Sequence, residues 1–235
     1  MIEFYLNGQP QKLDQTDPNL SILDWLRTKM RLNGTKEGCA SGDCGACTVL
    51  LGSLDPQGEW QYAAMNSCIG LIGALHGKHL ITVDALQREP AHPVQTAMVE
   101  CNGSQCGFCT PGIVMSLVGL HQQVAAAGQH ANAHQLMEAL AGNLCRCTGY
   151  RPIVEAGARS IVDSVQQWDG NALFSPQPSS SSSRPERRPP CCRMKQATVS
   201  LRRYRSRRCA RRWPTSRRRG WSQVVPTWRW RSPSS

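Results

Sequence analysis

The sequence predicts an α+β protein made of two compact domains and a basic tail. Along residues 1–84, short segments alternate apolar and polar residues, as strands do. Along residues 85–170, apolar residues recur at helical spacing instead. Residues 176–235 contain 17 Lys and Arg and one acidic residue, whereas residues 1–175 contain 10 Lys and Arg and 15 Asp and Glu. We therefore treat residues 171–235 as a disordered Arg/Ser/Pro-rich tail that is too charged to bury a core.

The first domain, residues 1–84, is expected to form a small mixed sheet of the β-grasp kind. Its strongest local signal is Asn7-Gly8, which is typical of a tight hairpin turn. The expected elements are strands at Ile2–Leu6 and Gln11–Leu13, a helix over Ile22–Met30 capped by Asp17 or Ser21, and strands at Thr48–Leu51, Trp60–Ala64 and His79–Val83.

The second domain, residues 85–170, is expected to be a four-helix bundle that follows a linker at Arg88–Pro93. Pro111 and Pro152 are placed just inside two helix starts, where the missing N–H of proline has no cost. The expected helices are Val94–Val99, Gly112–Ala127, His134–Ala141 and Ile153–Gln167. The longest apolar runs, such as Ile113–Leu120, are far shorter than the roughly 20 residues of a membrane span.

Nine of the 12 cysteines lie before the tail, and eight of them form two sets of four. The first set is Cys39, Cys44, Cys47 and Cys68; the second set is Cys106, Cys109, Cys145 and Cys147. Cys101 is left over. The first residues have neither the basic nor the apolar segment of a signal peptide, so we expect a cytoplasmic protein. Thiols stay reduced there, and clustered cysteines indicate metal binding before disulfides.

The first set has the C-x4-C-x2-C spacing and the distant fourth cysteine of plant-type 2Fe–2S ferredoxins. Its loop, residues 38–47, consists almost entirely of small residues. Glycine permits the positive-φ turns that bring backbone N–H groups close to cluster sulfurs. A structural zinc site would more often use two C-x2-C pairs. This set therefore predicts a 2Fe–2S cluster.

The second set combines a C-x2-C pair, Cys106 and Cys109, with a C-x-C pair, Cys145 and Cys147. Zinc or a thioredoxin-like site would explain the first pair but not the second. Four thiolates from two turns at helix starts suit a second four-thiolate cluster, because positive helix N-termini stabilise an anionic group.

Four segments carry a resemblance to a known family. They are Glu37–Thr48, Asn66–Cys68, Gly103–Gly112 and Asn143–Pro152. Together they resemble the iron–sulfur part of the molybdenum hydroxylases, most closely the small subunits of bacterial xanthine dehydrogenases. The resemblance covers residues 1–170, and all eight expected ligand positions are cysteine.

The resemblance implies an electron-transfer role. In that family a molybdopterin-bound molybdenum site hydroxylates a purine or an aldehyde, and electrons leave singly through two 2Fe–2S clusters to FAD, which reduces NAD. The second set would hold the cluster nearer molybdenum and the first set the cluster nearer flavin. Gln105 matches a glutamine that contacts the pterin. The chain itself would have no catalytic residue, and its partners would be a molybdopterin-binding large subunit and an FAD-binding domain or subunit.

Two alternatives remain open at this point. One is the small subunit of a carbon monoxide or aldehyde dehydrogenase. The other is a zinc-stabilised nucleic-acid-binding protein that uses the tail, in which arginines alternate with Trp213, Trp221, Trp228 and Trp230. The six histidines show no ligand spacing, and we expect them to be ordinary surface or helix residues.

The composition of the tail also fits a GC-rich gene that is translated out of frame. One choice of codons for Trp221–Ser235, read from one base upstream, encodes Leu-Val-Ala-Gly-Gly-Thr-Asp-Val-Ala-Leu-Glu-Val-Thr-Lys-Gln. That peptide resembles the start of the flavin-binding segment in the same family. We therefore expect sequencing of the gene to reveal an in-frame Gly-Gly-Thr-Asp one base away. Its absence would refute the frameshift.

Overall fold

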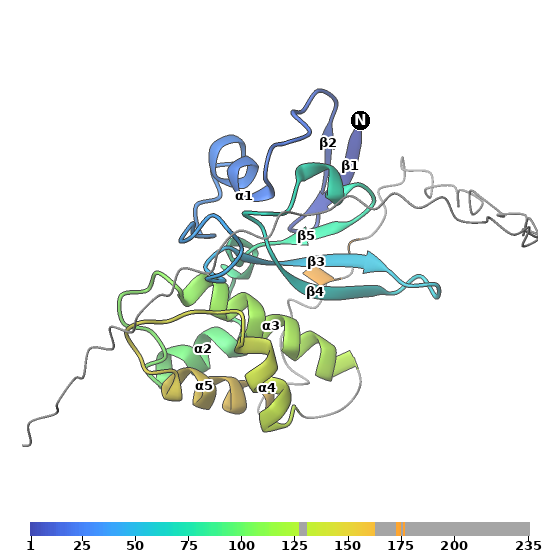
Figure 1. Cartoon of the computed structure of the whole chain (residues 1–235). Helices are drawn as coiled ribbons and strands as arrows, with labels where there is room; N and C mark the ends of the chain where they lie inside the picture. Colours follow the sequence, from blue (N-terminus) through green and yellow to red (C-terminus); the bar gives the residue numbers. More distant parts are fainter. Residues whose placement is uncertain (127–130, 163–172, 175, 177–235) are drawn as a thin grey trace, which may run out of the picture. The chain divides into compact units, whose positions relative to one another are not determined.

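The structure is a computed structural model, and it describes residues 1–126, 131–162, 173–174 and 176. A five-stranded sheet lies above a layer of helices (Figure 1). Most of the proposed tail, residues 171–235, lies outside the described residues. Leu173 and Phe174, at its expected start, are described and are buried in the core instead of being disordered. The expected α+β class is confirmed, because a mixed sheet and four later helices are all present. None of the described helices combines the length and the apolar character needed to cross a bilayer.

The sheet has the strand order β2-β1-β5-β3-β4. Its central pair, β1 and β5, is parallel, and the other neighbouring strands are antiparallel. The strands are β1 (Ile2–Leu6), β2 (Gln9–Leu13), β3 (Thr48–Leu54), β4 (Trp60–Asn66) and β5 (His79–Ile81). The hairpin turn lies at Asn7 and Gly8, which both have positive φ, as the sequence predicts.

The helix expected over Ile22–Met30 forms in a different way. Only α1 (Ile22–Asp24) is α-helical, and Trp25–Lys29 is π-helical. The Thr28 hydroxyl donates to the Asp24 carbonyl at 2.6 Å, so it competes for the acceptor that a continuous α-helix would use. Ser21 caps α1 by accepting from the Asp24 N–H at 3.0 Å. Asp17 is not the cap, and its carboxylate accepts from the Asn19 N–H instead.

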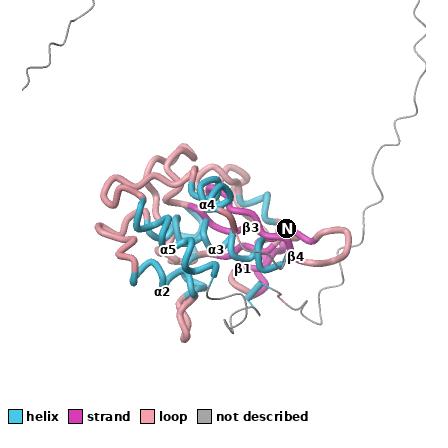
Figure 2. The backbone as a smooth tube through the Cα atoms, turned by 90° about the horizontal axis from the view of Figure 1, so that it is seen from below, coloured by secondary structure: helices cyan, strands magenta, loops and turns pink. Residues whose placement is uncertain are grey.

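The helical layer lies on one side of the sheet (Figures 1 and 2). It contains α2 (Pro93–Glu100), α3 (Thr110–Ala126), α4 (Ala133–Leu140) and α5 (Arg151–Val162). The four expected helices are thus present, and Pro111 and Pro152 each occupy the second helical position. The expected end of the last helix, at Gln167, lies outside the described residues. Pro93, expected in the linker, is the first residue of α2.

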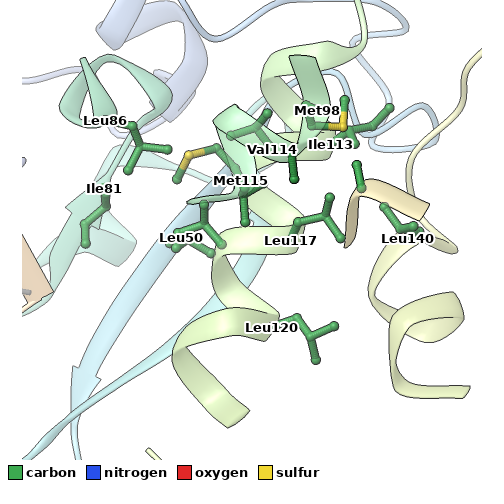
Figure 3. Close-up of a cluster of buried hydrophobic side chains, with 14 of the residues drawn as sticks. Leu50, Ile81, Leu86, Met98, Ile113, Val114, Met115, Leu117, Leu120 and Leu140 are labelled. Carbon is green, nitrogen blue, oxygen red and sulfur yellow. The ribbon is translucent and has the colours of Figure 1, made fainter. Parts of the chain in front are cut away.

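Helix α3 packs directly on the sheet. A Cβ on Gly119 would lie 2.8 Å from the Leu50 side chain, so the absence of a side chain lets α3 approach β3 closely. Figure 3 shows Leu50 and Ile81 of the sheet in the same buried cluster as Met115 and Leu117 of α3. The division at residue 84 stays a prediction, and residues from both sides of it share this core.

A second cluster covers the opposite face of the sheet. Phe4 and Trp25 meet edge to face there, with their ring centroids 5.4 Å apart. Ile22, Leu26 and Leu80 are fully buried in the same cluster. The sheet is therefore buried on both faces. This burial fixes the start of β3 and the end of β4, which lie next to the first set of cysteines.

The expectation that the histidines are ordinary surface or helix residues is wrong for two of them. His79, in β5, and His92, which caps α2, are completely buried, and neither lies within a helix. His79 accepts from the Gly8 N–H through Nε2 at 3.0 Å, so its proton resides on Nδ1. That N–H donates to the Tyr62 hydroxyl at 2.7 Å, and Tyr62 donates to the Phe174 carbonyl at 2.9 Å. The Gly8 N–H needs an unprotonated Nε2 as its acceptor, so this set of hydrogen bonds requires a neutral imidazole.

His79 should make the stability of the protein depend on pH. Burial lowers the pKa of His79 from 6.5 to about 4. Above pH 6.5 both the folded and the unfolded chain hold it neutral, and the full stability is present. As the pH falls toward 4, only the unfolded chain takes up the proton, so stability is lost. At about pH 5 this group should account for a loss on the order of 1–2 kcal/mol in the free energy of unfolding.

Denaturant titrations at a series of pH values measure this effect. His79→Gln should flatten the pH dependence between pH 6.5 and 5 relative to the unchanged protein. The control is His134→Gln, which alters an exposed histidine paired with Glu138. An identical pH dependence in His79→Gln and the unchanged protein would contradict the assignment.

Candidate metal centres

The first cysteine set is assembled from a loop and the end of a strand. Cys39, Cys44 and Cys47 lie in the segment that leads into β3, and Cys68 follows β4. The Cys39 thiol is hydrogen-bonded to Cys44, Cys68 is hydrogen-bonded to Cys47, and the charges of Cys39 and Cys68 interact. The strand pair β3–β4 thus brings the predicted fourth cysteine to the other three.

Hydrogen bonds stabilise negative charge on this set. The N–H groups of Ser41 and Asp43 both donate to Cys39 Sγ, at 3.4 and 3.3 Å. Hydrogen bonds from Ser41, and then from Cys44, lower the pKa of Cys39 to about 6. Burial raises the pKa of Cys68 to about 12. The set therefore favours the thiolate form at the exposed Cys39 and the protonated thiol at Cys68.

The loop around the first set is tightly turned. Ala40, Gly42 and Gly45 all have positive φ, which is rare for a residue with a side chain such as Ala40. A Cβ on Gly38 would lie 2.8 Å from Cys44 Sγ, so only glycine leaves room for that sulfur. The expected positive-φ turns lie at Gly42 and Gly45, whereas glycine at position 38 is needed for space.

Two residues beside Cys68 hold the loop in place, and the sequence analysis assigned them no role. The Asn66 side-chain amide donates to the Gly42 carbonyl. The Ser67 hydroxyl donates to the Cys47 carbonyl at 2.7 Å, and Ser67 is completely buried. Their position at the end of β4, directly before Cys68, was the available signal, because residues next to a ligand on a different strand can reach the ligand loop.

The second set joins two helix starts. Cys106 and Cys109 precede α3, and Cys145 and Cys147 precede α5, as predicted. The Cys106 thiol is hydrogen-bonded to Cys147, Cys109 is hydrogen-bonded to Cys145, and the charges of Cys106 and Cys145 interact. The four thiols therefore form two hydrogen-bonded pairs whose charges interact.

The thiols of this set also differ in pKa, but the difference does not follow their burial. Burial raises the pKa of Cys109 to about 12. Burial also raises the pKa of Cys145, but hydrogen bonds from the Thr148 hydroxyl and from backbone N–H groups outweigh that effect and bring it to about 7. The Thr148 hydroxyl lies 3.2 Å from Cys145 Sγ. A hydroxyl and backbone amides thus stabilise the thiolate form of Cys145.

Tyr150 is a further residue of this centre that sequence reasoning missed. Its φ is +68°, a conformation that residues with side chains seldom adopt. The Tyr150 hydroxyl accepts from the Cys145 N–H at 2.8 Å, and the Tyr150 N–H is bonded to the Thr148 hydroxyl at 3.2 Å. The turn therefore folds back over the ligand pair.

Three further features lie apart from the two thiol sets. Gln105 is exposed in the turn before Cys106. Cys101 follows α2, and its sulfur accepts from Arg159 at 3.6 Å. The buried rings of His92 and His121 lie against each other, with centroids 5.1 Å apart. Neither Cys101 nor these histidines belong to a thiol set.

The chemistry of the donors fits two 2Fe–2S clusters. All nine cysteines of the described residues are free thiols, and each set supplies the four sulfur ligands that such a cluster takes. Within the described ranges, no three His, Cys, Asp or Glu side chains close around the position of a single metal ion. Bound iron would replace the shared protons, since a coordinating thiol is deprotonated. The N–H groups aimed at Cys39 match the hydrogen bonding that tunes such clusters.

Comparison with known proteins gives two matches to family models. Residues 4–69 match a 2Fe–2S iron–sulfur cluster binding domain, and residues 82–158 match a [2Fe–2S] binding domain. The fold and the two thiol sets therefore define a protein with two 2Fe–2S binding domains.

Similar proteins of known name show which proteins with two 2Fe–2S domains this chain resembles. The chain is 48% identical over 157 residues to xanthine dehydrogenase of Blastobotrys adeninivorans and 41% identical over 168 residues to aldehyde oxidase 2 of Cavia porcellus. These matches cover 66% and 70% of the chain but only 11% and 12% of the relatives' length. Among solved structures, a chain of quinoline 2-oxidoreductase from Pseudomonas putida 86 is 31% identical with a TM-score of 0.58, and the match covers 73% of this chain and 94% of that one.

Aldehyde oxidoreductase from Desulfovibrio gigas is also similar, with 30% identity and a TM-score of 0.61 over 74% of this chain and 18% of that one. The chain belongs to the molybdenum hydroxylase family that includes xanthine dehydrogenase, and it corresponds to the iron–sulfur, electron-transferring part of that family.

We expect Cys44→Ser to abolish iron binding by the first set and leave the second set loaded. Serine is a poor substitute for a thiolate, and the second set takes all its ligands from other segments. Iron analysis should fall from about four to about two atoms per chain. Cys101→Ser, the matched control, should keep all the iron. Loss of both clusters in Cys44→Ser would contradict independent ligation.

Proposed function

We propose that this chain carries single electrons from a molybdopterin site toward FAD. The observation that supports this most directly is the presence of two complete four-thiol sets in one folded body. The proposed ligands are Cys39, Cys44, Cys47 and Cys68 for the first cluster and Cys106, Cys109, Cys145 and Cys147 for the second. Bound 2Fe–2S clusters supply one-electron redox chemistry, whereas purine hydroxylation and NAD reduction are two-electron reactions.

The residues of the chain contribute ligation and hydrogen bonding. Ser41, Asp43 and Thr148 place N–H or hydroxyl groups on the sulfurs, which sets how readily charge is accepted. Ser67 fixes the backbone behind Cys47. We assign no catalytic residue to the chain, because the substrate chemistry belongs to a partner.

We place the second set nearer molybdenum and the first nearer flavin, following the family resemblance. Gln105 is assigned to the pterin, and its exposure leaves it accessible to a partner. The partners are then a molybdopterin-binding large subunit and an FAD-binding domain or subunit. The free thiols favour a cytoplasmic location.

Xanthine dehydrogenase is the preferred whole enzyme, with a purine as substrate, because proteins of that name are 48% identical to this chain. A small subunit of a carbon monoxide or aldehyde dehydrogenase is the second candidate. It is favoured by the match that covers 94% of a separate chain of quinoline 2-oxidoreductase and by the similarity to an aldehyde oxidoreductase.

The full chain, purified without oxygen, provides the first test. We expect about four iron atoms, little zinc, and two distinct electron paramagnetic resonance signals after reduction. Electrons added one at a time should distribute over both clusters. A colourless protein with bound zinc would overturn the proposal and favour the nucleic-acid-binding alternative.

A test of the substrate class requires the partner subunit. In a complex with a molybdopterin-binding large subunit, xanthine should bleach the visible absorption of both clusters. Bleaching by an aldehyde or by carbon monoxide, but not by xanthine, would favour the second candidate. Gln105→Ala should slow bleaching by substrate while leaving bleaching by dithionite unchanged.

A further inference from the structure

We propose that Asn143 is a positioning residue that fixes the separation of the two thiol sets and thereby the rate of electron exchange between them. This inference rests on the proposed relay and adds a residue to it. Asn143 precedes the ligand pair Cys145 and Cys147, and only 4% of its surface is exposed. It lies between the segments that supply the two sets.

The two sets are joined by a backbone hydrogen bond. The Leu144 N–H donates to the Cys44 carbonyl at 2.9 Å. Leu144 is covalently bonded to Cys145, so this contact links a proposed ligand of one cluster to a proposed ligand of the other. Electron tunnelling falls steeply with the gap between donor and acceptor, so the length of this contact bears directly on the exchange rate.

The Asn143 carboxamide fixes that contact from three sides. Its Oδ1 accepts from the Ser116 hydroxyl of α3 at 2.7 Å. Its Nδ2 donates to the Gly45 carbonyl at 3.0 Å and lies 3.3 Å from Thr48 Oγ1. Gly45 lies next to Cys44, so the side chain of Asn143 and the backbone of Leu144 bind adjacent carbonyls of the first loop. A helix, a strand and both loops thus meet at one buried amide.

The backbones at this contact have no room to shift toward each other. A Cβ on Gly112, near the start of α3, would lie 2.0 Å from the Gly45 carbonyl oxygen. A Cβ on Gly45 would lie 2.3 Å from the Gly142 carbonyl oxygen, and the φ of Gly45 is +69°. Glycine at both positions allows an approach that no other residue would permit. The hydrogen bonds of Asn143 hold the loops at this limiting distance.

Two substitutions separate the loops by different means. Asn143→Asp keeps the shape of the side chain but replaces its donor with an oxygen, which then faces the Gly45 carbonyl. Gly112→Ala leaves the amide intact and inserts a methyl group against the same carbonyl. Asn132→Asp is the control, because it makes the same chemical change at the N-cap of α4, where aspartate also caps well.

The measurements use the full chain loaded with two clusters, which are both reduced for the magnetic coupling and both oxidised before the flash for the electron-exchange rate. Iron content and the separate signal of each cluster should be retained in Asn143→Asp and Gly112→Ala. The magnetic coupling between the clusters should fall several-fold, and so should the rate at which an electron from a flash reductant equilibrates between them. The control should keep both values of the unchanged protein.

Unchanged coupling and exchange rate in both variants would overturn the inference. So would loss of a cluster from both variants, because Asn143 would then serve folding alone. The proposed relay fails separately: in that case an electron added to the unchanged protein would stay on one cluster.

Discussion

Holding four sulfur atoms together, twice within one small body, is the constraint on which the rest of this structure depends. Thiolates repel one another, and burial further penalises their charge. The chain offsets this with N–H and hydroxyl groups directed at Cys39 and Cys145 and with helices that begin beside the second set. These groups lie in turns with positive φ, and such turns persist only when the structure around them is rigid. The doubly covered sheet and helix α3 provide that rigidity.

The rigidity comes from one hydrophobic core that the sheet and the helices share, and not from two separate cores. Leu50 and Tyr62 from the sheet lie in the same cluster as Met115 and Ile153 from the helices. Both thiol loops start from elements that this cluster immobilises, namely β3, β4, α3 and α5. A disturbance of one face is therefore transmitted to the bases of both loops, because a close-packed interior yields little.

Much of this arrangement could be predicted from the residue pattern. Local sequence patterns predicted the hairpin at Asn7-Gly8, the helix starts at Pro111 and Pro152, and the grouping of eight cysteines. Each of these features is determined by residues close together in the sequence. The π-helical turn at Trp25 could not be predicted, since it depends on one hydroxyl of Thr28 and on packing against Phe4. The burial of His79 was missed because its partners, Gly8 and Tyr62, lie far away in the chain.

The candidate site shows the same division. The spacing of the cysteines predicted the two sets, but it contained no information on how the sets meet. Asn143, Gly45 and Gly112 belong to three different segments, and only the folded chain brings them together. Ser67 and Tyr150 stood beside ligands in the sequence, but their hydrogen bonds depend on turns whose direction no local pattern specifies.

Each set has sulfurs of both kinds: Cys47 and Cys145 are buried, whereas Cys39, Cys106 and Cys147 are exposed. Peroxide or molecular oxygen would meet the outer sulfurs first, and a low pKa, as at Cys39, speeds conversion to sulfenic acid. A chelator would likewise strip iron from the outward edge while the inner ligands still held it. Unless another polypeptide covers those edges, clusters bound to this chain are exposed on one side to oxidation and to loss of iron.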